Sequence, residues 1–431
     1  MKLLTTREYA RIPYAELTEK QIERLHEFDH KRATAANQTV FDWSFKNYLR
    51  VQNYVGVIQV PGLTVEILPK IDETSSDQEG LPESTTRLAQ QNLLYMLSVT
   101  RNLPFRERNL ASLKTKKLSV LDALIAMFAD RLLHELNRGV YHKYVYREDN
   151  LQCLTGKLLI PEHIRRNMVR RDRVYVGFDE FDCDVLLNRI LKAGCLVMLG
   201  MVRDVKVQKT LRETLLYLAD VSDVMIGAHD FDALHMDRQS ERFAPLIEFC
   251  RIVLTQRSPA PQTGKSDTFS LLFPMEQLFE QFVGYFIQRH ASEFGLRREQ
   301  VRLQARGRIK HLLRRDNRKV VRMLPDIHID DENNQAKRIV DTKWKRLKTD
   351  EEDRRNGVSQ ADLYQLYAYA TRYKCQRNVL LYPKVGGATG GSFTLADDPA
   401  TEIHVAQIDL NRDLRREKTE VVKDLREVLD L

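Results

Sequence analysis

The chain has 431 residues, enough for two or three domains, and 68 Lys and Arg against 60 Asp and Glu give a net charge of +8, compatible with a polyanionic partner. Its five cysteines are scattered without a CxxC pair, which argues against a disulfide framework or a zinc site. The first residues lack the apolar core of a signal peptide and no run is long enough to span a bilayer, so we expect a cytoplasmic protein without membrane contact.

Residues 1–75 alternate short β-type runs with turns. Tyr54–Val60 and Leu63–Leu68 are separated by a Pro-Gly turn, which predicts a hairpin. This part of the chain is therefore interpreted as a β-rich amino-terminal unit. The acidic, Ser/Thr-rich stretch Ile71–Arg87 follows and is interpreted as a solvated linker.

Residues 86–257 are interpreted as a mainly helical middle region. Val120–Asn137, preceded by a capping serine at Ser119, and the apolar run Leu186–Met201 predict two long helices. Between them, Ile164–Arg173 carries five arginines. This cluster is either a solvated loop or a contact with DNA or a partner.

The stretch Gln256–Asp267 is a Pro-rich break between regions. Its GKS triplet at 264–266 resembles the tail of a phosphate-binding loop. Pro259, however, stands where such a loop needs a glycine to let the backbone curl around phosphates. We therefore expect that the chain hydrolyses no nucleotide itself.

Beyond this break lies the stretch with the clearest chemical pattern. Two β-rich runs, Lys319–Ile329 and Ala336–Leu347, flank a six-residue polar turn and predict a hairpin. Because side chains on a strand alternate with period two, Asp341 and Lys343 emerge on one face, roughly 7 Å apart along the chain. Pairing across the turn can bring Asp326 beside Asp341. Two carboxylates and a lysine would then converge.

This convergence suits the hydrolysis of phosphodiester bonds. Carboxylate oxygens hold Mg²⁺ or Mn²⁺, which can activate a water and stabilise charge on the leaving oxygen. The lysine can orient the water or neutralise charge on phosphorus. The segment from Val301 to Met323 adds nine cations against one acid. We expect it to attract the DNA backbone, with phosphate contacts by Arg314, Arg315 and Arg318.

Several stretches resemble known proteins. Pro325-Asp326 followed by Asp341-Thr342-Lys343 resembles the PD-(D/E)xK nuclease motif. The stretches VGVIQVPGLTVEILPKI, GKLLIPEHIRRN, FDEFDCDVLLNRILK and IVDTKWKRL are similar to the McrC family, the nuclease subunits of McrBC modification-dependent restriction systems. The resemblance spans most of the chain, which a shared nuclease motif alone would not do.

The resemblance adds three residues to the candidate site. Glu280 matches the LFE element of the family and would complete the metal site together with Asp326 and Asp341. Glu276, one turn earlier, is a rival, and a surface glutamate on an amphipathic helix is the competing interpretation. Gln365 and Tyr369 match a QxxxY element that supports the site and the DNA strand. A tyrosine-rich packing face is the alternative there.

The resemblance and the order of elements imply a mixed α/β, multidomain fold. The unit at 1–75 would contact a motor partner, the middle region would be helical, and residues 268–431 would form a PD-(D/E)xK nuclease domain with a mixed sheet flanked by helices.

The function that the resemblance implies is that of an endonuclease subunit in a GTP-dependent, 5-methylcytosine-specific restriction complex acting on double-stranded DNA. A McrB-like AAA+ GTPase ring would bind the GTP and read the modified base, and this chain would stimulate its GTP hydrolysis. An assembly or regulatory module of an AAA+ motor with a vestigial nuclease site is one alternative. A stand-alone DNA repair nuclease is another.

Overall fold

The computed structural model describes residues 2–36, 38–71, 82–100, 118–255, 268–316, 318–345, 347, 357–384 and 390–431. The chain divides into two compact units, the first comprising Met1–Thr115 with Pro259–Leu431 and the second Lys116–Ser258. The Pro-rich break with its GKS triplet lies outside the described residues, as does most of the stretch interpreted as a linker. The end of that stretch, from Glu83 onward, is the beginning of helix α2 (Glu83–Val99) and not a loop.

A buried four-stranded sheet forms the amino-terminal part of the first unit, in the order β1-β6-β5-β10. Strand β1 (Lys2–Arg7) runs parallel to β6 (Leu63–Leu68), and β5 (Tyr54–Val60) pairs antiparallel with both β6 and β10 (Phe269–Pro274). The hairpin expected around the Pro-Gly turn is therefore present. Strand β10 follows the Pro-rich break, so a segment from the second half of the chain completes this sheet. It approaches β5 closely: a Cβ on Gly56 would lie 2.0 Å from the Leu271 carbonyl oxygen.

An apolar core lies beneath this sheet and joins it to the rest of the amino-terminal part. The elements that share the core are helix α1 (Glu19–Ala36) and the three-stranded sheet of β2 (Arg11–Pro13), β4 (Tyr48–Val51) and β3 (Phe41–Asp42).

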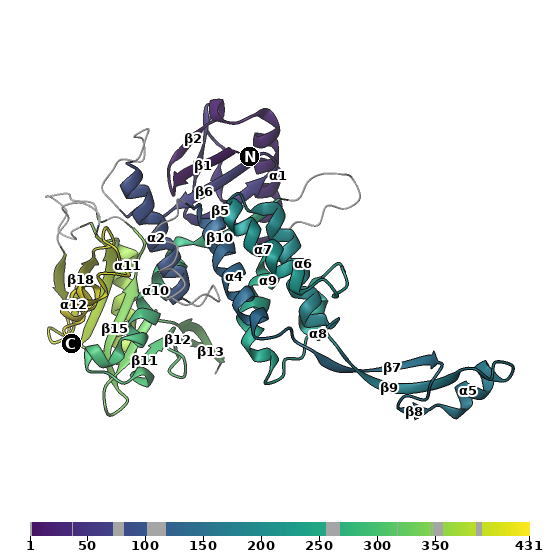
Figure 1. Ribbon diagram of the computed structural model, residues 1–431. Coiled ribbons are helices and arrows are strands. Elements are labelled where there is room, and N and C mark those ends of the chain that lie inside the picture. The colour runs from purple at the N-terminus through teal and green to yellow at the C-terminus, as the bar shows by residue number, and fades with distance from the viewer. Residues whose placement is uncertain are drawn as a thin grey trace. The chain divides into compact units, whose positions relative to one another are not determined.

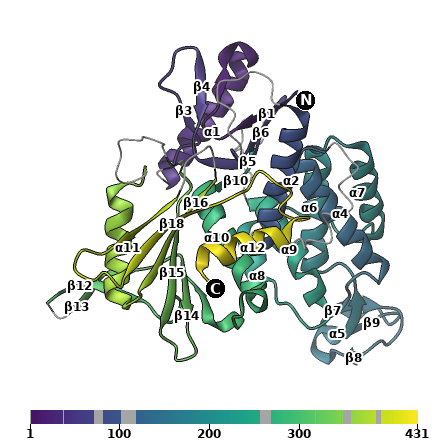
Figure 2. The ribbon, with the colours of Figure 1, turned by 90° about the vertical axis from the view of Figure 1, so that its left-hand side faces the viewer.

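The carboxyl-terminal part of the first unit is a six-stranded mixed sheet in the order β11-β14-β15-β16-β18-β17. Its centre is parallel and consists of β15 (Ala336–Thr342), β16 (Arg377–Pro383) and β18 (Glu402–Ile408). The antiparallel strands are β11 (Val301–Leu303), β14 (Ile327–Asp330) and β17 (Gly391–Thr394). Helix α11 (Gln360–Tyr373) lies on one face, and α10 (Met275–Arg289) and α12 (Lys418–Leu429) lie on the other (Figure 2). The expected mixed α/β class, with a helix-flanked carboxyl-terminal sheet, is confirmed.

The predicted hairpin is present as β14 and β15, but both strands are shorter than the sequence pattern suggests. The run Lys319–Ile329 divides into β13 (Arg318–Met323) and β14, and β13 pairs with β12 (Lys310–Arg315) in a separate two-stranded ribbon. Pro325 lies in the break between them, where it has no N–H to donate to a ladder. We call β12 and β13 the basic ribbon.

The second unit combines helices with a long strand pair. Its helices are α4 (Val120–Asn137), α6 (Leu186–Met201), α7 (Val205–Tyr217), α8 (Ala228–Ala233) and α9 (Ala244–Thr255). Strands β7 (Lys143–Leu151) and β9 (Val174–Asp182) pair over nine residues and carry β8 (Lys157–Leu158) and α5 (Ile160–Asn167) between them. We call residues 143–182 the arm (Figure 1). Helix α5 contains Arg165 and Arg166, so the loop interpretation of the arginine cluster is wrong for these two residues.

Across the residues that the structure describes, no helix is both long and apolar enough to cross a membrane.

Candidate active site

Two aspartates meet where β14 and β15 pair. Ile327 lies opposite Val340, so the register places Asp326, just before β14, across from Asp341 near the end of β15. Asp341 is fully buried. The Oδ2 atom of Asp326 accepts hydrogen bonds of 2.7 Å from both the backbone N–H and the hydroxyl of Thr342, which turn the carboxylate toward β15.

Helix α11 organises the lysine of this site. Lys343 Nζ lies 2.5 Å from Asp341 Oδ2 and donates a hydrogen bond of 3.1 Å to Gln365 Oε1. The amide nitrogen of Gln365 donates to Asp341 Oδ1 at 3.2 Å and to the Tyr369 hydroxyl at 3.0 Å. One amide thus contacts the carboxylate, the ammonium and the phenol. The i,i+4 spacing of Gln365 and Tyr369 puts them on the same helix face, and the structure turns that face toward Asp341.

Glu280, and not Glu276, lies beside the two aspartates. Glu280 on α10 is half-buried and interacts electrostatically with Asp341 and Lys343. Glu276 is exposed, and its charge acts on Tyr9, a residue far from it in the sequence. The structure therefore brings together Asp326, Asp341, Lys343, Glu280, Gln365 and Tyr369.

Gln304 is a residue of the site that sequence reasoning missed. Its side chain donates a hydrogen bond of 3.1 Å to Glu280 Oε1, and its backbone N–H donates one of 2.8 Å to the Asp326 carbonyl oxygen. Its φ of +49° lies in the left-handed region that non-glycine residues rarely adopt. Gln304 thus connects the two acidic elements. No local pattern marks it, because both its contacts join segments that are far apart in the sequence.

The carboxylates raise one another's pKa. Burial, followed by the charge of Asp326, raises the pKa of Asp341 to about 7. Burial, followed by the charge of Glu280, raises the pKa of Asp326 to about 6. Burial alone would lower the pKa of Lys343, but the charges of Asp341 and Asp326 hold it above its ordinary value. The lysine therefore remains an ammonium, and the carboxylates favour the binding of a proton or another cation.

The donor set fits Mg²⁺ or Mn²⁺ in one particular way. Among the described residues, no three His, Cys, Asp or Glu side chains stand close enough to hold a metal by themselves. Mg²⁺, however, is commonly bound by one or two carboxylates together with water and substrate phosphates. The adjacent, mutually repelling Asp326 and Asp341 match that pattern, with Glu280 beside them.

Three arginines expected to contact DNA lie away from this cluster. Arg314, Arg315 and Arg318 are exposed on the basic ribbon. The base of the ribbon is nevertheless tied to α11. The Tyr373 hydroxyl accepts a hydrogen bond of 3.2 Å from Lys310 N and donates one of 3.0 Å to the Met323 carbonyl oxygen.

Comparisons with known proteins agree with this architecture. The family model described as McrBC 5-methylcytosine restriction system component matches residues 49–383. The chain is similar to one chain of an assembly of Thermococcus gammatolerans McrB AAA+ hexamers with bound McrC, with a TM-score of 0.72 and 19% identity over 97% of this chain and 100% of that one. It is also similar to a chain of the cryo-EM structure of the Thermococcus gammatolerans McrBC complex, with a TM-score of 0.54 and 21% identity over 67% and 88% of the two chains. At these identities the likeness shows the fold. No curated protein matches the chain.

The raised aspartate pKa values predict how stability depends on pH in the metal-free protein. Between about pH 4 and 7, the folded state binds more protons than the unfolded state, so the free energy of unfolding should fall as pH rises through this window. In Asp341→Asn the free energy of unfolding should decrease less across this window, by roughly 1.4 kcal/mol for each unit of pKa shift removed. The measurement is denaturant unfolding with a chelator present at several pH values. The exposed Asp316→Asn is the control, and equal slopes for wild type and Asp341→Asn would contradict the assignment.

Proposed function

The chain belongs to the McrBC family of 5-methylcytosine restriction system components, and we propose that it is the metal-dependent endonuclease subunit of such a system. The observation that carries this proposal is the convergence of Asp326, Asp341 and Lys343 at the end of one hairpin. The reaction is hydrolysis of phosphodiester bonds in double-stranded DNA, with the modified cytosine read by the partner subunit.

The residues of the hairpin divide the chemistry among them. Asp326 and Asp341 would hold Mg²⁺ or Mn²⁺, which when bound lowers the pKa of the attacking water and neutralises charge on the leaving oxygen. Lys343, an ammonium beside Asp341, can donate a hydrogen bond to the attacking water or to a phosphate oxygen, where negative charge grows in the transition state. Gln365 fixes the ammonium relative to the carboxylate.

Glu280 adds a third carboxylate at the edge of the pair. Its Oε1 atom is held by Gln304, and burial, opposed by that hydrogen bond and reinforced by Asp341, raises its pKa. A carboxylate of this kind can accept a hydrogen bond from water at the site.

The basic ribbon supplies a surface for the DNA backbone. Arg314, Arg315 and Arg318 are exposed on it together with Lys319 and Arg322, and the chain passes directly from its second strand through Pro325 to Asp326. Leu312, Leu313 and Val321 are 45–55% exposed on the same ribbon. A two-stranded ribbon is narrow enough to enter a DNA groove. Cations beside exposed apolar side chains suit contact with phosphates and sugars.

The partner that we propose is a McrB-like AAA+ GTPase ring, and GTP acts only through it. The solved assembly similar to this chain contains McrB AAA+ hexamers with bound McrC. We place the contact on the arm, and not on the unit at 1–75 that the resemblance implied, because the arm exposes large apolar side chains, with 56–91% of each accessible: Tyr144, Tyr146, Met168, Val169 and Phe181. Exposed apolar side chains gathered on one element are typical of interaction surfaces. A stand-alone repair nuclease would have no evident use for them.

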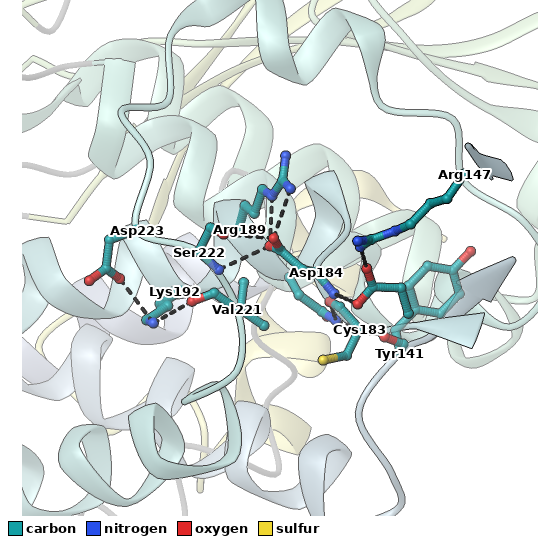
Figure 3. Close-up of polar contacts among 11 residues, drawn as sticks. Tyr141, Arg147, Cys183, Asp184, Arg189, Lys192, Val221, Ser222 and Asp223 are labelled. Atoms are coloured by element: carbon teal, nitrogen blue, oxygen red, sulfur yellow. Dashed lines mark hydrogen bonds and ion pairs between the residues drawn. The ribbon is translucent and has the colours of Figure 1, made fainter. Parts of the chain in front are cut away.

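A polar network at the root of the arm holds its orientation relative to the helices of its own unit (Figure 3). Asp184 accepts hydrogen bonds from Arg189 at 2.7 and 2.9 Å and from the N–H and hydroxyl of Ser222 at 2.9 and 2.6 Å. The Arg189 guanidinium holds the pKa of Asp184 well below its usual range. Arg147 on β7 pairs with Asp182 on β9. The FDEFDCDVLLNRILK stretch, which resembles the McrC family, thus supplies the residues that orient the arm.

The catalytic assignment predicts that Asp326→Ala, Asp341→Ala and Lys343→Ala each reduce DNA cleavage by at least about a hundredfold while the protein stays folded, because each removes a metal ligand or a charge-stabilising donor. The assay uses the purified chain with a McrB-like partner, GTP, Mg²⁺ and methylated DNA. Glu280→Ala should impair cutting, whereas the matched Glu276→Ala should not.

Undiminished cutting by Asp341→Ala would refute the site. A wild-type chain that stimulates GTP hydrolysis but never cuts would favour the regulatory module with a vestigial site.

The basic ribbon predicts a change in the salt dependence of DNA binding. Replacing Arg314, Arg315 and Arg318 together by Gln should reduce the slope of log affinity against log salt by roughly one for each lost phosphate contact. The loss should be equal on methylated and unmethylated duplexes, because phosphates carry no sequence information. Titrations at several salt concentrations measure it. The control removes the same charge from α7, as Lys206→Gln, Lys209→Gln and Arg212→Gln. A ribbon variant with the wild-type slope would show that these arginines do not contact DNA.

The arm predicts the outcome of a partner-binding experiment. Met168→Ser with Val169→Ser should weaken binding to the GTPase ring by at least about tenfold and lower the stimulation of GTP turnover, since exposed apolar anchors often dominate an interface. Thermal stability should not change, because both side chains are exposed. Leu216→Ser with Met225→Ser removes comparably exposed apolar groups elsewhere in the same unit. Equal effects of the two pairs would contradict a specific role for the arm.

A further inference from the structure

Trp344, the residue after Lys343, connects the nuclease hairpin to the amino-terminal sheet. Its indole Nε1 lies 2.9 Å from each carboxylate oxygen of Glu8 and donates to both. The two side chains are buried, with Glu8 1% and Trp344 6% exposed. Glu8 follows β1, and its Oε1 atom also accepts a hydrogen bond of 2.9 Å from Lys70 N, just beyond β6. The paired ends of two strands therefore hold the acceptor of the indole.

A second contact of Trp344 reaches the helix of Glu280. The ring centroids of Trp344 and Phe279 are 5.2 Å apart with the planes tilted by 58°, and Phe279 is fully buried. Phe279 immediately precedes Glu280 on α10. Trp344 thus follows Lys343 in the sequence and packs against Phe279, the residue before Glu280.

The backbone near Lys343 gives this contact its importance. The parallel ladder between β15 and β16 ends at Thr342, and Lys343 N donates one last hydrogen bond of 2.9 Å to the Leu381 carbonyl oxygen. Trp344 lies outside the strand. Beyond the ladder, the anchored indole is the first side-chain contact that fixes the direction in which the chain leaves Lys343, and the ion pair of Lys345 with Asp362 on α11 follows it.

We infer that Glu8 and Trp344 form a positioning pair for Lys343, so that the amino-terminal sheet is part of the nuclease geometry. This inference rests on the proposed nuclease function. A buried carboxylate is costly to leave without its donors, so a displacement of Glu8 carries the indole with it, and the indole carries the adjoining lysine backbone. A catalytic group moved by about an ångström can lose two orders of magnitude in rate.

The test separates positioning from stability. Trp344→Phe keeps an aromatic ring against Phe279 but removes the N–H donor. It should lower the single-turnover cleavage rate by about tenfold or more, with DNA affinity unchanged. Glu8→Gln retains an acceptor oxygen and should cut within about threefold of wild type.

The double variant Glu8→Leu with Trp344→Phe removes the buried carboxylate together with its donor. It should recover part of the melting temperature lost in Trp344→Phe, because the carboxylate that lost the indole donor is gone, although Lys70 N then loses its acceptor; yet it should cut no faster. Recovery of cutting in parallel with the melting temperature would reduce the pair to a structural role and overturn the inference.

Asn92→Ala is the matched control for a buried contact in the same unit. Asn92 donates hydrogen bonds to the carbonyl oxygens of Leu410 and Arg412 at 3.0 and 2.8 Å and accepts one of 3.2 Å from Leu414 N, and none of these partners lies in the hairpin. Its melting temperature should fall while the cleavage rate of the folded protein stays at the wild-type value. A comparable loss of cutting in Asn92→Ala would show that general destabilisation explains the effect of Trp344→Phe.

A measurement without DNA separates this inference from the proposed function. The effects of Glu8→Leu and Trp344→Phe on the free energy of unfolding should be strongly non-additive, because the residues share one contact. Additive effects would overturn the positioning pair whether or not the chain cuts DNA. An inactive wild type with coupled residues would instead refute the proposed nuclease and leave the contact established.

Discussion

The repulsion between two carboxylates held side by side is the constraint around which the carboxyl-terminal part of the protein is built. The register of β14 and β15 makes Asp326 and Asp341 face each other, and low-dielectric surroundings strengthen their repulsion. Hydrogen bonds from Thr342 offset it for Asp326, and Lys343 with Gln365 offset it for Asp341. Burial, and after it the charge of a neighbouring carboxylate, still raises the pKa of both aspartates. The pair therefore favours the binding of a cation, which is the physical argument for the metal that we propose.

Sequence reasoning captured the parts of this arrangement that depend on local spacing. The alternation within IVDTK and the six-residue turn placed Asp326, Asp341 and Lys343 near one another, and the i,i+4 spacing placed Gln365 with Tyr369. The mixed α/β class followed from the order of elements and the family resemblance. The choice between Glu280 and Glu276 remained open in the sequence because it depends on how α10 is rotated against a sheet formed by distant residues. Gln304 joins α10 to Asp326, and no spacing rule connects those segments.

The arm shows a different limit of sequence reasoning. Strand β7 is largely exposed on both faces, so it lacks the alternation of buried and exposed residues by which a strand is recognised. Its pairing with β9 joins segments separated by β8 and α5. The residues that anchor it were visible in the FDEFDCDVLLNRILK stretch, but their partners, such as Ser222, lie in a later loop. In the sequence this charged stretch shows only a family resemblance. The physical role of its charged residues follows from their contacts in the structure.

The hairpin of the candidate site is held from three sides, and this explains why its geometry is not a local property. Helix α10 contributes Glu280, bridged to the strand by Gln304, whereas α11 contributes Gln365 and, one turn beyond Tyr369, the Tyr373 hydroxyl that ties down the basic ribbon. The amino-terminal sheet contributes Glu8 through Trp344. Each anchor is a polar contact between distant segments, and each carries its own desolvation cost if its partner is lost. A displacement of α10, α11 or the amino-terminal sheet would therefore move Asp341 or Lys343, and the candidate site would respond to strain arising elsewhere in the same unit.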